Sequence, residues 1–326
     1  MNNLLQWRAL GRVFGPEEGA PWMISHAQVP TPLLDEAAGI IRVYFASRPR
    51  DGCSLTGFVD LDANDPTKVR CVHPTPLLEL GKPGTFDEHG VMPSCAVRHG
   101  GLVYLYYSGW SRATTVPYTN STGLAISEDG GITFRRVSDG PILAKSLIDP
   151  YSATSPFVML HQGVWRMWYC SGTDWLDVDG KYEHVYDLKE ASSTDGVHWV
   201  PSGRVSLSVK DSEQALTRPW VFRAHNEWQL WYCQRQAQDF RDGVGAYRIA
   251  HARSSDDLQS WRRAGEPQLP PPAAVNPWDR IARAYPSLLQ VGSRILLFYN
   301  GDGFGRRGFG LASAELDSLS EESHQG

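Results

Sequence analysis

The stretch from Leu102 to Phe134 decides the fold, because the chain repeats its pattern. It reads LVYLYYSGW, followed after a loop by TGLAISEDGGITF. From Val103 to Ser108 successive side chains alternate between two faces, a period of two that predicts a β-strand. The second run predicts a returning strand, a tight acidic turn and the entry of a further strand.

The same pattern occurs four more times. It returns as WRMWYCSGT before SSTDGVHW, as WQLWYCQRQ before SSDDLQSW, and as RILLFYNGD before GFGLASAEL, and a degenerate copy, IRVYFASR before LTGFVDLD, comes first. The last aromatic residues of the copies, spaced 62, 62, 63 and 67 residues apart, are Phe45, Tyr107, Tyr169, Tyr232 and Tyr299. A near-constant period of this length predicts a repeat architecture whose units do not fold alone.

Each repeat predicts four antiparallel strands, with a proline near the start of the first strand. These prolines are Pro32, Pro93, Pro156, Pro219 and Pro286. The expected units are 22–78, 85–143, 149–207, 213–269 and 279–317. The last unit lacks a fourth strand, and WRALGRVF at Trp7 is similar to WRRAGEPQL at Trp261. We therefore expect residues 5–14 to complete it, giving a single all-β domain, a five-bladed β-propeller with four antiparallel strands per blade.

Composition is consistent with a soluble, aromatic-rich β protein. The 326 residues include 12 Trp, 13 Tyr and 31 Gly, and the net charge of -5 argues against nucleic acid as a partner. The five cysteines have no CxxC spacing, which favours buried thiols over disulfides or a zinc site. The N-terminal residues show neither a basic region nor a long apolar run, so we expect no membrane span and a cytoplasmic location.

Acidic residues precede most of the first-strand prolines. Counting back six or seven positions gives His26, Asp87, Asp149, Glu213 and Asp279. In an antiparallel blade these positions share one face with the segments after the aligned aromatics, so the carboxylates should converge on a central funnel. Converging carboxylates acquire separated pKa values and perform acid–base catalysis. We predict Asp87, Glu88, Asp149, Glu213 and Asp279 as catalytic; the alternative for each is a loop cap or a salt bridge to arginine.

Arginine and aromatic residues are also expected on this face. Guanidinium groups bind phosphate or carboxylate, and aromatic rings stack on sugars; the alternatives are arginines that pair with the acids and rings that pack the loops. The predicted substrate-binding residues are His26, Arg48, His89, Trp110, Arg112, Tyr151, Trp175, Arg218, Arg235, Arg283, Tyr285 and Asn300. No metal site or cofactor is expected, and the sequence does not indicate an oligomeric state.

The chain resembles the five-bladed propeller glycosidase superfamily, which includes families 43, 32, 68 and 130. Within it, the chain is most similar to glycosidase-like proteins of bacterial polysaccharide biosynthesis, on FDEHGVMPS, RPWVF, AYPSLL and FYNG. Sialidase Asp-box hairpins resemble the SEDGG, STDGV and SSDDL turns, which we expect to be structural. The resemblance implies an acid on the first strand of each of the first three blades. The second and third of these positions fall on Asp87 and Asp149, whereas the first falls on His26, which is not a carboxylate.

Two functions follow as expectations. The first is a carbohydrate-active enzyme that cleaves or transfers a glycosyl unit, with a sugar, sugar phosphate or nucleotide sugar held through an anionic group. Asp87 is then the first candidate for the general acid or base, and a bound phosphate could replace an activated water. The alternative is a non-catalytic glycan-binding or scaffold propeller in polysaccharide biosynthesis.

Overall fold

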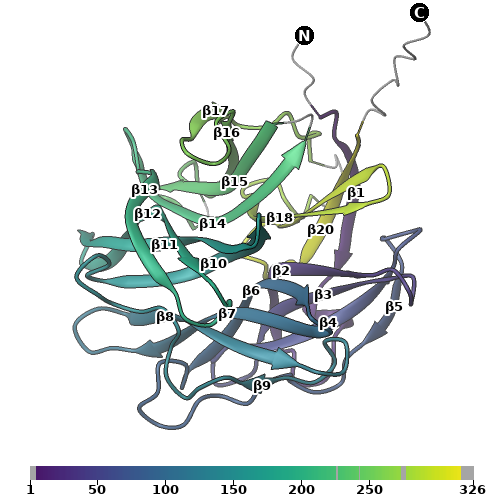
Figure 1. The fold of residues 1–326 in the computed structure, drawn as a ribbon, viewed down its shortest axis with the longest axis horizontal. Helices are drawn as coiled ribbons and strands as arrows, with labels where there is room; N and C mark the ends of the chain where they lie inside the picture. The colour runs from purple at the N-terminus through teal and green to yellow at the C-terminus, as the bar shows by residue number, and fades with distance from the viewer. Residues whose placement is uncertain (1–4, 225–226, 242, 273–276, 317–326) are drawn as a thin grey trace, which may run out of the picture.

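The structure is a computed structural model that describes residues 5–224, 227–241, 243–272 and 277–316. It is built from β-strands, and the helical turn η1 (Pro16–Glu18) is the one helix within those residues (Figure 1). No helix in these ranges is long and apolar enough to cross a lipid bilayer. The expected end of the last unit, residue 317, lies outside the described residues.

Strand pairing gives five antiparallel groups of four strands. Group one is β2 (Ser25–Asp35), β3 (Ile40–Arg48), β4 (Leu55–Asp62) and β5 (Val69–Val72). Group two is β6 (Gly90–His99), β7 (Leu102–Arg112), β8 (Tyr118–Ser127) and β9 (Arg135–Arg136). Group three is β10 (Ser152–His161), β11 (Val164–Val178), β12 (Lys181–Ser193) and β13 (Val200–Leu207).

The remaining groups use both ends of the chain. Group four is β14 (Glu213–Ala224), β15 (Glu227–Gln236), β16 (Arg248–Ser254) and β17 (Arg262–Gly265). Group five is β18 (Ala284–Val291), β19 (Arg294–Asn300), β20 (Phe309–Glu315) and β1 (Arg8–Phe14). The expected pairing of the N-terminal strand with the last repeat is therefore present.

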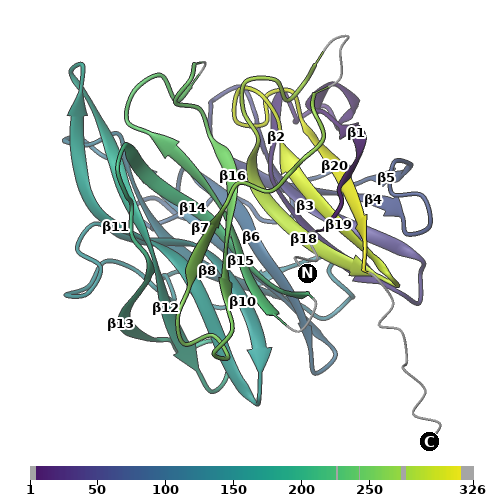
Figure 2. The ribbon, with the colours of Figure 1, turned by 90° about the horizontal axis from the view of Figure 1, so that it is seen from above.

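The first strands of the groups contact one another around a centre (Figures 1 and 2). Strand β2 contacts β6 and β18, β6 contacts β10, β10 contacts β14, and β14 contacts β18. Hydrogen bonding does not run through all groups. Single parallel pairs between β8 and β10 and between β12 and β14 join groups two, three and four into one sheet, and groups one and five are separate sheets.

Aromatic packing joins the N-terminal strand to both the first and the last repeat. The Phe14 ring is fully buried, with its centroid 5.1 Å from that of Phe45 in β3 and 5.8 Å from that of Phe309 in β20. Burial of the ring removes a large apolar surface from water. Phe14 therefore packs β1 against both group one and group five, which are distant in sequence.

Three acidic turns share one hydrogen-bond pattern, as their sequences predict. In the first, the Asp129 carboxylate accepts a bond from the Ser127 hydroxyl at 2.7 Å and from the Thr133 amide at 2.9 Å. Asp195 and Asp256 make equivalent bonds in groups three and four. These contacts are internal to each turn, which supports the structural interpretation.

In four groups the aligned tyrosine lies beside an acid and a cation. The Tyr107, Tyr169 and Tyr299 hydroxyls donate to Asp87 at 3.0 Å, Asp149 at 2.9 Å and Asp279 at 3.0 Å. In group four Arg263 bonds both Glu213 and the Tyr232 hydroxyl. The cation–carboxylate pairs are Arg136–Asp87 (2.8 Å), Lys189–Asp149 (3.2 Å), Arg263–Glu213 (2.7 Å) and Arg283–Asp279 (2.8 Å).

Group one differs in its register. Pro30, not Pro32 as the spacing predicts, occupies the place of Pro156, because the turn between Asp35 and Ile40 is two residues longer than its counterpart in group three. The position equivalent to Asp149 is consequently not His26.

Group one also has a register shift between Ser25 and Gln28 that group three lacks, so the counterpart of Asp149 falls at Trp22 or Met23, neither of which is acidic. Met23 is buried in the same apolar cluster as Phe45, the one aligned aromatic without a hydroxyl, and Trp22 packs against that cluster. The acid is therefore present where the aromatic has a hydroxyl to share and absent where it does not. This correlation indicates that the acids are structural partners of the tyrosines.

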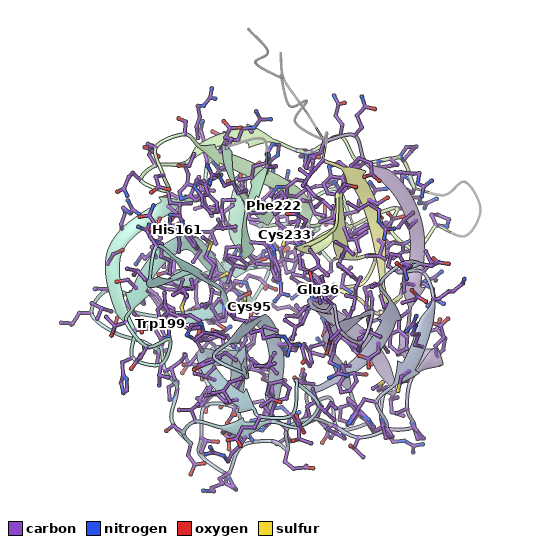
Figure 3. The ribbon with its side chains drawn as sticks, turned by 45° about the vertical axis from the view of Figure 1, so that its right-hand side comes forward. Glu36, Cys95, His161, Trp199, Phe222 and Cys233 are labelled. Carbon is purple, nitrogen blue, oxygen red and sulfur yellow. The ribbon has the colours of Figure 1, made fainter. Side chains whose placement is uncertain are left out.

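Four of the five cysteines are buried, as expected, and Figure 3 shows Cys95 and Cys233 toward the centre of the molecule. Cys71 is exposed, contrary to the expectation for residues in strands, because it lies on β5 at the outer edge of group one. Burial raises the pKa of Cys95 to about 12 and that of Cys233 to about 11, so both are neutral thiols at physiological pH.

Replacement of Phe14 by alanine should destabilise the fold. We expect the free energy of unfolding to fall by about 3–5 kcal/mol, because a fully buried ring between two groups is lost. Urea denaturation followed by tryptophan fluorescence measures this. The control is Arg8→Ala, an exposed change on the same strand, for which the shift should stay within about 0.5 kcal/mol; equal effects would contradict the role of Phe14.

Replacement of Lys189 by methionine should also be costly. Asp149 is fully buried and would lose its cation, for which we expect a loss of about 3–5 kcal/mol in the free energy of unfolding. Lys82→Met is the matched control, since Lys82 pairs with Asp139 in an exposed contact and should contribute less than about 1 kcal/mol. A small effect for Lys189→Met in the same denaturation assay would argue against a structural ion pair.

Candidate functional site

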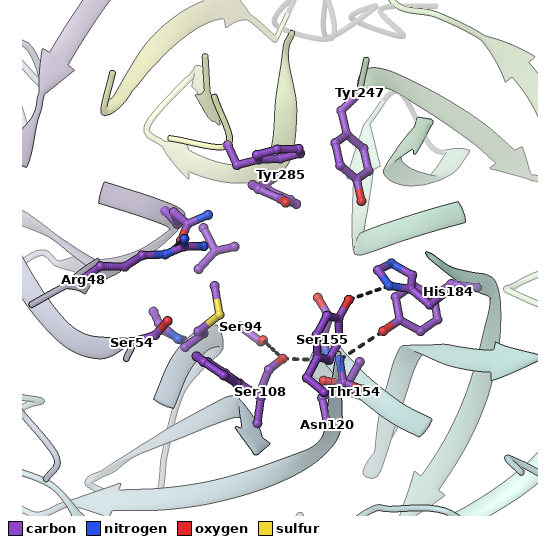
Figure 4. A pocket seen from close by; sticks show the side chains of 18 of the residues that line it. Arg48, Ser54, Ser94, Ser108, Asn120, Thr154, Ser155, His184, Tyr247 and Tyr285 are labelled. Atoms are coloured by element: carbon purple, nitrogen blue, oxygen red, sulfur yellow. Dashed lines mark hydrogen bonds between the residues drawn. The ribbon is translucent and has the colours of Figure 1, made fainter. Parts of the chain in front are cut away.

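A cavity of about 330 Å³ lies where the first strands meet (Figure 4). Strands β2, β6, β10 and β18 all contribute to its wall. The lining residues are Gln28, Val29, Arg48, Gly52, Ser54, Met92, Pro93, Ser94, Ser108, Trp110, Tyr118, Asn120, Thr154, Ser155, His184, Tyr186, Tyr247, Tyr285 and Phe304. We refer to this cavity as the central pocket.

Irregular backbone shapes the wall of the central pocket. Val29, Ser155, Arg218 and Tyr285 each precede a proline and have φ between 51° and 57°. The strand register shifts at each of these positions. Such bulges redirect side chains, and left-handed φ at non-glycine residues is a strain that concentrates at functional sites. Three of the four residues line the pocket.

Neutral polar groups form much of the wall. The Ser94 and Ser108 hydroxyls are 3.2 Å apart, and the Ser155 amide donates to the Ser108 hydroxyl at 3.0 Å. On another part of the wall, the Asn120 amide donates to the Tyr186 hydroxyl at 3.1 Å. Hydroxyl and amide groups both donate and accept, which suits a polyhydroxylated ligand.

Aromatic rings form the opposite side, with Tyr247 and Tyr285 at the top of Figure 4. The centroid of Tyr247 is 5.5 Å from that of Tyr285 and 5.9 Å from that of Phe304. Trp110 adds a further ring, stacked on His89 at 5.9 Å. The apolar face of a small ligand could stack there.

The charge around the central pocket is positive. Arg48 donates from Nε to the Gln28 side chain at 3.2 Å, and no carboxylate of the described residues lies within salt-bridge distance of it. Burial lowers the pKa of Arg48. Burial and the nearby Arg48 and Arg306 guanidiniums also lower the pKa of His26 to about 4, so this imidazole is neutral at pH 7.

A second guanidinium lies beneath the pocket. Arg218 is 1% exposed and donates to the Pro93 carbonyl at 3.1 Å, the Pro30 carbonyl at 3.0 Å and the Thr31 hydroxyl at 2.8 Å. Burial lowers its pKa to about 10, so it stays charged at pH 7. Among the residues that the structure describes, no carboxylate pairs with it.

The acids expected to converge in the funnel lie elsewhere. Asp87, Asp149, Glu213 and Asp279 do not line the central pocket. The three aspartates are bonded by the cation and the tyrosine of their own groups, and Glu213 is bonded by Arg263. Glu88 accepts a bond from the Gly84 amide at 2.8 Å and also lies outside the lining. No aspartate or glutamate of the described residues lines the pocket, which differs from the expected gathering of carboxylates.

The expected binding residues are divided. Arg48, Trp110 and Tyr285 line the central pocket. Four more support its lining: His26 and Arg218 as described above, His89 through its stacking on Trp110, and Arg235, which donates to the Tyr247 hydroxyl at 3.2 Å.

The other five expected residues do not line the pocket. Trp175 packs edge-on against Tyr118 and His184. Arg283 pairs with Asp279, and the buried Asn300 amide bonds the backbone of β2. Arg112 and Tyr151 are exposed, and Arg112 donates to a loop carbonyl.

Sequence reasoning missed the neutral part of the wall. Ser94, Ser108, Asn120, Thr154 and His184 were not expected there, because single neutral polar residues in strands carry no pattern of their own. The available signal was position: Thr154 and Ser155 directly precede Pro156, at the place where the first strand bulges.

Comparisons with known proteins place the fold. No family model matches the chain. The solved structure of a glycoside hydrolase is similar, with a TM-score of 0.69, 14% identity, and coverage of 94% of this chain and 91% of that one. The catalytic domain of the Coprinopsis cinerea GH62 α-L-arabinofuranosidase gives a TM-score of 0.65 at 11% identity, with coverage of 97% and 98%. A thermostable family-43 glycoside hydrolase gives 0.58 at 13% identity, with coverage of 91% and 90%.

These likenesses establish an all-β, glycosidase-like propeller fold, as the resemblance predicts. At the level of sequence, the uncharacterized protein Rv1502 of Mycobacterium tuberculosis is 37% identical over 314 residues, which cover 95% of this chain and 100% of that protein. The uncharacterized protein MT1551, from another strain of that species, is 37% identical over the same length. The chain therefore belongs to the family of Rv1502 and shares its fold with glycoside hydrolases.

Proposed function

We propose that the central pocket binds a glycosyl ligand that carries an anionic group. The observation that carries this proposal is the pairing of Arg48, free of any carboxylate within the described residues, with a wall of neutral hydroxyl, amide and aromatic groups. A guanidinium binds carboxylate or phosphate through paired hydrogen bonds. The glycosidase-like fold supports a carbohydrate as the rest of the ligand.

The dimensions of the pocket limit the ligand. A volume of about 330 Å³ is at the lower end of the range for small-molecule sites. A single glycosyl unit, such as a hexuronate or a hexose phosphate, therefore suits it better than an oligosaccharide. A nucleotide sugar would have to extend out of the pocket.

The architecture around the pocket is part of the proposal. The five strand groups act as the blades of a closed five-bladed propeller, with the N-terminal strand in the last blade and the unit boundaries near those expected from the repeats. The ring of contacts among β2, β6, β10, β14 and β18 supports this closure. A cytoplasmic location and a role in polysaccharide biosynthesis remain predictions from the sequence.

Glycosyl cleavage or transfer is the second candidate. Its support is that the similar solved structures are glycoside hydrolases. Most glycoside hydrolases cleave the glycosidic bond with two carboxyl groups about 5–10 Å apart. Glu88 is the expected acid with a contact toward the wall, since it lies 3.7 Å from His89, which stacks on Trp110. Asp87 would first have to leave Arg136.

Arg48→Gln tests the binding proposal. Titration calorimetry with hexuronates, hexose 1-phosphates and the neutral hexoses should show binding of an acidic sugar to the wild type, weakened about tenfold to a hundredfold in the variant. Arg50→Gln, an exposed arginine two residues away, is the control and should bind as the wild type does. Equal binding by Arg48→Gln, or a preference for neutral sugars, would contradict the proposal.

Hydrolysis assays separate the two candidates. Because no carboxylate of the described residues lines the pocket, we expect no release of sugar from aryl glycosides above background. Asp87→Asn should then change thermal stability without any change in ligand affinity. Turnover by the wild type that Glu88→Gln abolishes would instead support the enzyme.

A further inference from the structure

Two buried polar atoms in the wall of the central pocket have no hydrogen-bond partner. Among the described residues that line the pocket, only the Nε2 atom of His184 and the Oγ1 atom of Thr154 are in this state. Figure 4 shows His184 on the side of the pocket opposite Arg48. An unpaired buried polar group is costly, so such atoms in a binding pocket point to a partner supplied by the ligand.

The position of the His184 ring is fixed by its neighbours. It stacks on Tyr186 with a centroid distance of 3.9 Å, and Trp175 lies edge-on to it at 5.7 Å. The Tyr118 hydroxyl is 2.5 Å from Nδ1. The Tyr186 hydroxyl accepts a bond from the Asn120 amide at 3.1 Å. Among the described residues, Nδ1 of His184 is the only hydrogen-bond partner of the Tyr118 hydroxyl, which favours Tyr118 as the donor in that contact.

The groups around His184 keep the imidazole uncharged. Arg235 donates to the His184 carbonyl, and Arg241 pairs with the neighbouring Glu183. Burial, with these two arginines, lowers the pKa of His184 well below its usual value. A neutral imidazole that accepts the Tyr118 hydrogen at Nδ1 must carry its own hydrogen on Nε2.

We propose that His184 is a specificity-determining residue: its Nε2–H donates to a hydroxyl oxygen of the bound glycosyl unit, and Thr154 Oγ1 bonds a hydroxyl on the same side. This proposal rests on the proposed function and specifies it further. With the anionic group of the ligand at Arg48, the hydroxyl that His184 binds lies on the opposite side of the sugar ring from that anionic group. The ligand class is a hexuronate or hexose phosphate recognised at both ends.

The contact is tested by a thermodynamic cycle in which one hydroxyl of the ligand and the His184 side chain are removed separately and together. The acidic sugar that binds the wild type is compared with each of its monodeoxy analogues, on wild type and on His184→Phe. One deoxygenation should weaken wild-type binding about tenfold to a hundredfold and should have little effect on the variant, because the partner is already absent. His251→Phe, another buried neutral imidazole outside this pocket, should behave as wild type. Independent losses at every position would overturn the assignment.

The tautomer is measured without any ligand. Long-range ¹H–¹⁵N correlation spectra should show His184 with hydrogen on Nε2 from pH 8 to pH 5, and Tyr118→Phe should relax that preference. A charged ring, or hydrogen on Nδ1, would overturn the proposal even if acidic sugars bind. Failure of every acidic sugar to bind the wild type would overturn the proposed function and, with it, the contact, whereas the spectra report on the His184 tautomer alone.

Discussion

The constraint on which the structure depends is the placement of a carboxylate beside the aligned tyrosine in four of its five strand groups. The carboxylate is buried in three of them, at Asp87, Asp149 and Asp279, and half-buried in the fourth, at Glu213. A buried carboxylate is tolerated when a cation and hydrogen-bond donors surround it, and it is strongly destabilising otherwise. Asp149, for example, has Lys189, Tyr169 and Ser171 as partners and no exposure to water. Group one avoids the problem, since Phe45 needs no acceptor and Met23 fills the space.

This arrangement determines which kinds of side chain line the central pocket. The acids are bonded within their own strand groups, so the described wall of the central pocket consists of neutral and aromatic groups with Arg48 at one side. Arg218 beneath them is held by carbonyl and hydroxyl oxygens, which stabilise its charge without neutralising it. A low-dielectric floor with an uncompensated positive charge favours an anion above it.

The repeat predicted the strands well because each copy carries its own alternation, turn residues and aligned aromatic. It also predicted the pairing of the N-terminal strand, since WRALGRVF has the pattern of a fourth strand. The site was less predictable. Spacing from the prolines selected Asp87 and Asp149 as candidates, but it could not show that Arg136 and Lys189, about 40 to 50 residues later, would bind them. The neutral wall had no periodic signal.

The bulges before the prolines separate the site from the scaffold. In a regular strand, the side chains of Val29, Ser155 and Tyr285 would alternate between the two faces of the sheet and take part in its packing. A substitution at any of them would then disturb the core. The bulge takes each residue out of the regular alternation of side chains, so the residue type at that position is not restricted by packing between the sheets. A valine, a serine and a tyrosine therefore occupy equivalent places, although the neighbouring strands are alike. The fold shared with glycoside hydrolases can in this way hold a pocket whose described lining includes no carboxylate, while the strand groups around it stay alike.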